Sequence, residues 1–238
     1  MYRLVTLLIL TTLFLLGCST AAPTETPLDP RTLLTEAAAN LRAKQTFRVI
    51  IERDGAEYLF ATDLGDVGFE RAEGQYVAPD TIGAKVKIVL AELPIEADVY
   101  AKGATQSVRG IWTSMQWQEG VFAQGFDPSK ILAEDAGLDT AMKALVDPQL
   151  VGEETLEDGT AVYHIRATAN GPDVAALVVN LIQMTDTVNV DLYIGKDNAL
   201  PQRFVIVQPD TAADGQEPTT WTIDLYDFDA ESNIELPG

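Results

Sequence analysis

The sequence predicts an α+β protein built mainly from one antiparallel β-sheet, and three observations support this prediction. Short segments with alternating apolar and polar residues recur between Phe47 and Leu225. Pairs of turn-forming residues separate these segments, as expected for hairpins that connect antiparallel neighbours. Only three segments have the apolar spacing of helices, and no repeat of 20 to 50 residues indicates a solenoid or a propeller.

The N-terminus has the features of a lipoprotein signal. Residues 1–17 contain a positive Arg3 and an apolar run that is too short for a convincing membrane span. They predict a signal peptide that is cleaved before Cys18, whose thiol would be acylated; the alternative is an ordinary secretory peptide with an incidental cysteine. Residues 18–28 are small, Thr-rich and broken by proline, which predicts a flexible tether. Residues 29–238 are expected to form a single domain.

The first helix is expected directly after this tether. Asp29 is a good N-cap and Pro30 suits the first helical turn. The apolar residues that follow share one helical face, namely Leu33, Leu34, Ala37, Ala38 and Leu41.

Strands follow with a period of two residues, the pattern of a sheet with one apolar and one polar face. The clearest examples alternate at Phe47, Val49 and Ile51, at Val86, Ile88 and Leu90, at Ile95, Ala97, Val99 and Ala101, at Val188, Val190, Leu192 and Ile194, and at Trp221, Ile223 and Leu225. The hairpin signals between them are Asp54-Gly55, Glu73-Gly74, Lys102-Gly103, Asp158-Gly159 and Lys196-Asp197-Asn198.

Two further helical segments interrupt the strands. Residues 128–146 predict two helical pieces that are broken near Gly137. Residues 172–184 are apolar around nearly the whole helical circumference, which is typical of a helix that is buried or that faces something apolar.

Charge and missing motifs exclude several classes of function. The chain has 16 Lys and Arg against 36 Asp and Glu, a net charge of −20 that repels nucleic acid. His164 is the sole histidine, no Gly-x-Ser-x-Gly or nucleotide-binding motif occurs, and one cysteine with one histidine cannot form a zinc cluster. We therefore expect no enzyme activity, cofactor or metal. A carboxylate pair of the glycosidase kind remains as a minor alternative.

The C-terminal acidic residues have two interpretations. Asp224, Asp227, Asp229 and Glu231 could bind a hard cation loosely, or they form a solvated acidic edge. The second interpretation is favoured because their spacing differs from that of an EF-hand.

Two stretches resemble the LppX/LprAFG family of bacterial envelope lipoproteins. The first contains residues 126–132, 137–138 and 150–154 and the hairpin from Asp158-Gly159 into residues 163–165; the second runs from Val190 through residues 196–197 to Arg203. The resemblance implies a half-barrel similar to the LolA and LolB carriers, a strongly curved antiparallel β-sheet that wraps several helices around an apolar cavity. In that family the cavity holds acylated lipids or glycolipids, and there is no catalytic motif to carry over.

This resemblance and the apolar faces together predict a non-enzymatic lipoprotein that carries acyl chains within or across the cell envelope. We expect an extracytoplasmic monomer, anchored to the membrane through Cys18, with an acylated lipid or glycolipid as ligand and a membrane transporter as a further partner. The alternative is a cell-surface scaffold whose core is filled by its own side chains. The residues expected to line the cavity are Val86, Ile88, Leu90, Val99, Leu177, Val178, Leu181, Ile182, Val190, Leu192, Ile194, Trp221 and Ile223.

Overall fold

The structure is a computed structural model. It describes residues 28–62, 65–123, 125–134, 136–175, 182, 184–213 and 215–238. The expected signal peptide, the acylated Cys18 and residues 18–27 of the expected tether lie outside this part of the chain.

The described residues form three α-helices, three 3-10 turns and twelve strands. The helices are α1 (Pro30–Arg42), α2 (Gly137–Lys143) and α3 (Gly171–Val174), and the 3-10 turns are η1 (Ile111–Thr113), η2 (Pro128–Lys130) and η4 (Pro209–Thr211). The strands are β1 (Thr46–Asp54), β2 (Leu59–Thr62), β3 (Gly65–Val77), β4 (Thr81–Leu90), β5 (Leu93–Lys102), β6 (Thr105–Gly110), β7 (Gln118–Glu119), β8 (Val146–Thr155), β9 (Ala161–Asn170), β10 (Thr187–Gly195), β11 (Pro201–Gln208) and β12 (Thr219–Tyr226).

All twelve strands belong to one antiparallel sheet. Its order is β7-β6-β5-β4-β3-β1-β12-β11-β10-β9-β8, and β2 pairs with β3 beside this path. The sheet is open, because the path ends at β7 on one side and at β8 on the other. The predicted antiparallel sheet is thereby confirmed, and the structure adds few helices to it; a strongly curved sheet that wraps several helices remains an expectation.

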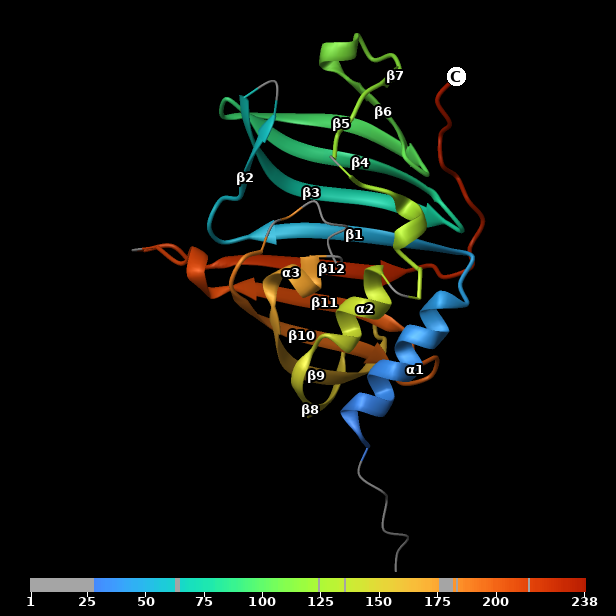
Figure 1. The fold of residues 1–238 in the computed structure, drawn as a ribbon, viewed down its shortest axis with the longest axis vertical. Coiled ribbons are helices and arrows are strands. Elements are labelled where there is room, and N and C mark those ends of the chain that lie inside the picture. Colours follow the sequence, from blue (N-terminus) through green and yellow to red (C-terminus); the bar gives the residue numbers. More distant parts are fainter. Residues whose placement is uncertain are drawn as a thin grey trace, which may run out of the picture.

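Helix α1 begins as its sequence predicts. The Asp29 carboxylate accepts hydrogen bonds from the backbone N–H of Thr32 at 3.0 Å and from its hydroxyl at 2.8 Å. These bonds satisfy a backbone donor that has no partner within the helix. The five apolar residues expected on one face are all buried, and together with α2 they lie over β8–β12 (Figure 1).

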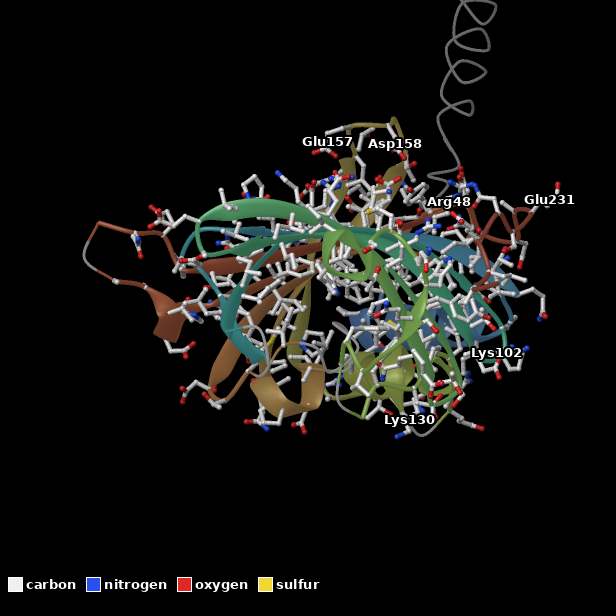
Figure 2. The ribbon with its side chains drawn as sticks, turned by 90° about the horizontal axis from the view of Figure 1, so that it is seen from above. Arg48, Lys102, Lys130, Glu157, Asp158 and Glu231 are labelled. Carbon is white, nitrogen blue, oxygen red and sulfur yellow. The ribbon has the colours of Figure 1, made fainter. Side chains whose placement is uncertain are left out.

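The strand register places apolar side chains on one face across the whole sheet. Ile51 of β1 lies opposite both Ile223 of β12 and Ala72 of β3, and Ala72 lies opposite Val86 of β4. We call the face that carries these residues the inner face, because the helices lie on it. Figure 2 shows Arg48 on the opposite, outer face and Lys130 of η2 on the helix side.

Most of the expected hairpins are present. The turns at Lys102-Gly103, Asp158-Gly159 and residues 196–198 connect β5 to β6, β8 to β9 and β10 to β11. The short turn between β4 and β5, at Ala91-Glu92, was not among the predicted turns, since neither residue is a typical turn former.

The hairpin expected at Glu73-Gly74 is wrong, because both residues lie inside β3. Gly74 pairs with Val49 on one side and with Ala84 on the other. A Cβ at this position would lie 2.7 Å from both the Ala84 Cβ and the Gly83 carbonyl oxygen. The glycine therefore permits close strand packing rather than a turn.

The two expected helical segments differ in outcome. Residues 128–146 form η2 and α2, with the second piece beginning at Gly137 as predicted. The helix expected over residues 172–184 does not reach its predicted C-terminal end: α3 begins at Gly171 and ends at Val174, and Ile182 and Met184 are not helical. The Gly171 N–H donates to the Asp186 carbonyl at 2.9 Å, so this segment returns to its origin, which a straight helix of about 20 Å would prevent.

The cap of α1 gives a pH-dependent prediction. Asp29→Ala should lower the melting temperature at neutral pH by on the order of 2 °C, whereas Asp29→Asn should retain most of the cap. The hydrogen bond from the Thr32 side chain lowers the pKa of Asp29. Its carboxylate therefore stabilises the fold above the ordinary aspartate pKa of about 3.9, and this contribution is lost as the pH falls through the lowered value. Thermal unfolding should show the gap between wild type and Asp29→Ala shrinking below about pH 4; an undiminished gap would contradict it.

The packing at Gly74 gives a second prediction. Gly74→Ala should reduce the free energy of unfolding by roughly 1–3 kcal/mol, because the new methyl group clashes with β4. The matched control is Gly120→Ala, whose Cβ would lie 3.6 Å from Val108, an ordinary contact. Denaturant titration of both variants measures their free energies of unfolding. Equal values would contradict the prediction, because they would show that β3 and β4 accommodate the methyl group without loss of stability.

Candidate functional site

The inner face has no charge along the strands β3–β6. In β4 its positions are Ile82, Ala84, Val86, Ile88 and Leu90, and their register partners on β5 run from Ala101 to Leu93. The partners on β3 run from Tyr76 to Val67, and those on β6 are Gln106, Val108 and Gly110. Among these positions Gln106 has a side-chain amide and Tyr76 a hydroxyl, which donates to the Pro79 carbonyl at 2.8 Å, and the others are apolar or glycine. Such a surface suits hydrocarbon and disfavours charged ligands.

This part of the inner face is only partly covered by protein. Val86, Ile88, Leu90 and Val99, four of the expected lining residues, are half-buried. In Figure 1 the helices lie in front of β8–β12 and leave the middle of β3–β5 without a helix in front of it. We call this surface the apolar half-face; its half-buried members are Ala72, Ile82, Val86, Ile88, Ile95, Val99 and Val108.

The rest of the inner face is packed against the helices. Five other expected lining residues have exposed fractions of 0–1%, and they are Val190, Leu192, Ile194, Trp221 and Ile223. Protein atoms therefore cover them on every side. Their role as lining residues remains a prediction, and the half-buried set provides the accessible apolar surface.

The expected helical wall is described only at its edges. Ile182 is 4% exposed and belongs to the hydrophobic core with Val174 and Met184. The expected lining residues Leu177, Val178 and Leu181 lie outside the described residues. Their contribution to the site remains a prediction.

Gln106 holds a loop against one end of the apolar half-face. Its side-chain amide nitrogen donates to the carbonyl oxygens of Ala123 at 2.7 Å and Phe126 at 3.3 Å. Its amide oxygen accepts from the N–H groups of Phe122 and Ala123, both at 3.0 Å. The sequence analysis missed this residue, although a glutamine at an inward-facing strand position was the available signal. The bonds place the Phe122 and Phe126 rings 5.7 Å apart beside the sheet.

The outer face behind the apolar half-face is charged. Asp98 bonds to both Arg109 and Lys85, and Arg109 also binds Glu235 of the C-terminal segment. Burial raises the pKa of Asp98, but the hydrogen bonds from Arg109 and Lys85 outweigh it and the pKa is lowered. A cavity of about 350 Å³ lies here, lined by charged residues such as Arg48 and Asp98 and by the C-terminal segment. The two faces of the same strands thus differ sharply in polarity.

His164 and three of the four C-terminal acidic residues singled out in the sequence have side-chain partners. His164 is 4% exposed, and its ring nitrogens lie 2.6 Å from carboxylate oxygens of Glu154 and Asp191. Asp224 pairs with Arg203, Asp227 with Arg48 and Asp229 with Lys44.

Within the described ranges no group of three or more His, Cys, Asp or Glu side chains is arranged to hold a metal ion. No helix in that part of the chain is long and apolar enough to span a membrane.

Comparisons with known proteins agree with this geometry. The structure is similar to that of LprF from Mycobacterium bovis, with a TM-score of 0.62 and 15% identity over 87% of this chain and 96% of that one. It is also similar to the lipoprotein LppX from Mycobacterium tuberculosis, with a TM-score of 0.57 and 15% identity over 87% of this chain and 100% of that one. At this identity the likeness concerns the fold. No curated protein sequence matches the chain.

The family model described as LppX_LprAFG lipoprotein matches residues 29–234, nearly all of the described part of the chain. This range includes every strand of the sheet, the apolar half-face and the loop held by Gln106. The resemblance seen in the sequence is therefore confirmed, and the chain belongs to the LppX_LprAFG lipoprotein family.

Proposed function

We propose that this protein is a non-enzymatic lipid-binding lipoprotein that holds acyl chains on the apolar half-face and carries them within or across the cell envelope. The observation that carries the proposal is an uncharged inner face on β3–β6, on which the seven apolar side chains of the apolar half-face are only half-buried. Each methylene removed from water contributes about 0.8 kcal/mol, so an acyl chain gains strongly from contact with such a surface. The headgroup would stay near solvent.

Membership in a lipoprotein family supports the anchoring part of the proposal. We infer that Cys18 is acylated after cleavage of residues 1–17, which would place the protein outside the cytoplasm on a membrane. Two or more acyl chains make such an anchor stable, whereas one chain gives only reversible binding. The ligand is an acylated lipid or glycolipid, and a membrane transporter is a further proposed partner.

A scaffold with a filled core is the second candidate. The fully buried apolar side chains on the inner face of β10–β12 favour it, since that part of the sheet is packed by the protein itself. It differs from the lipid carrier in its prediction for β3–β6, where the scaffold would take up no lipid.

A charge on the apolar half-face tests the proposed function. Val86→Asp should reduce uptake of a fluorescent diacyl lipid from phosphatidylcholine vesicles by on the order of tenfold, because a carboxylate beside hydrocarbon must be desolvated. The protein form for this assay begins at residue 19, so that the anchor does not bind the vesicles. The matched control is Val207→Asp, a half-buried valine on the outer face of β11. Equal uptake by the two variants, or no uptake by wild type, would count against the proposal and favour the scaffold.

The loop held by Gln106 gives a separate prediction. Gln106→Leu removes four hydrogen bonds and leaves part-buried backbone groups of Phe122 and Ala123 and the buried Phe126 carbonyl without these partners. The free energy of unfolding should fall by about 2 kcal/mol or more. Hydrogen exchange at the amides of Phe122 and Ala123 should accelerate well before that of the strands. Unchanged protection of these amides would show that the loop is held by other contacts.

A further inference from the structure

A turn at the end of β6 exposes three large apolar side chains. Ile111 is 72% exposed, Trp112 is 40% exposed and Met115 is 60% exposed. Large apolar side chains exposed together mark contact sites more often than single ones do. We call residues 110–115 the apolar tip.

Backbone and side-chain hydrogen bonds fix the shape of the apolar tip. The Gly110 N–H donates to the Thr113 hydroxyl at 3.0 Å, and that hydroxyl donates to the Gly110 carbonyl at 3.0 Å. The Met115 N–H also donates to the Gly110 carbonyl at 3.0 Å. Thr113 is buried within this turn, so its exposed neighbours Ile111 and Met115 are held outward by a closed hydrogen-bonded structure.

The apolar tip lacks charge although the chain as a whole is strongly acidic. No Asp, Glu, Lys or Arg occurs between Gly110 and Gln118, whereas the net charge of the chain is −20. The preceding residue, Arg109, is engaged on the outer face by Asp98 and Glu235. An uncharged surface that includes a tryptophan is suited to the boundary between bilayer and water.

The apolar tip is continuous with the apolar half-face. Gly110 occupies an inner-face position opposite Ala97. A Cβ at Gly110 would lie 2.9 Å from the six-membered ring of Trp112, so the indole covers the inner side of this glycine. Trp112 therefore connects the exposed tip to the inner-face surface of β5 and β6.

From these observations we propose that the apolar tip inserts into the interfacial region of a neutral phospholipid bilayer and orients the apolar half-face toward it. A stable protein interface takes roughly 20–30 residues a side, whereas the tip has three exposed apolar side chains, which suits shallow insertion. Because the rest of the chain is acidic, contact with zwitterionic lipid is favoured over contact with anionic lipid. The inference adds a membrane-docking surface to the proposed lipid binding.

Quenching by brominated lipid tests this proposal. The full chain is incorporated into vesicles of phosphatidylcholine whose acyl chains are either brominated or unmodified. Bromine should reduce the tryptophan emission by up to about one third, since Trp112 is one of three tryptophans and the indole is expected at the bilayer interface. Trp112→Phe should abolish this loss, whereas an equal loss in that variant would overturn the proposal.

A double substitution separates bilayer contact from lipid held on the apolar half-face. Ile111→Ser with Met115→Ser removes the outward side chains and leaves the inner-face positions intact, so it should reduce the quenching roughly twofold or more. The matched control is Val146→Ser with Val151→Ser, two valines of β8 that are 48% and 50% exposed; it should quench as wild type does. Quenching that stays at the wild-type level in the tip variant would come from retained lipid alone and would overturn docking while supporting lipid binding. Absence of quenching in wild type would overturn docking as well.

Discussion

The strand register is the constraint on which the rest of the structure depends. It keeps apolar side chains on one face from β12 through β1 and β3 to β5, as in the row formed by Ile223, Ile51, Ala72, Val86 and Ala97. A slip of one residue would turn every apolar side chain of a strand to the outer face. The same alternation concentrates charge on the outer face, which allows an acidic chain to keep its inner face uncharged.

One face of one sheet is used in two different ways. Along β10–β12 the protein's own side chains bury its apolar residues, and this half provides the hydrophobic core that holds a chain whose one cysteine rules out an internal disulfide. Along β3–β6 the apolar half-face stays half-buried, bounded by the loop that Gln106 holds and by the apolar tip. The buried half supplies rigidity, and the accessible half supplies the surface on which the proposed function depends. Trp112 is where this surface meets the exposed tip.

Local patterns predicted much of this fold. The cap and buried face of α1, the break at Gly137 and most hairpins follow from spacing and turn chemistry, because these signals act within a few residues. Gly74 was misassigned as a turn, since close packing of β3 against β4 is a long-range contact that composition does not reveal. The helix expected to end at Met184 was overestimated, because periodicity cannot register that Gly171 bonds to Asp186. Which part of the inner face stays accessible depends on where the helices pack. The lining residues predicted from the sequence therefore include both buried and half-buried positions.

The most direct measurement is the location of a bound acyl chain. A diacyl lipid with a photoactivatable group at the end of one acyl chain, incubated with the protein and illuminated, would label the residues nearest to it. Peptide mass spectrometry should find the label on inner-face residues of β4, β5 and β6, such as Val86, Val99 and Val108. Label confined to the outer face, or no label above that on a protein that binds no lipid, would contradict the account.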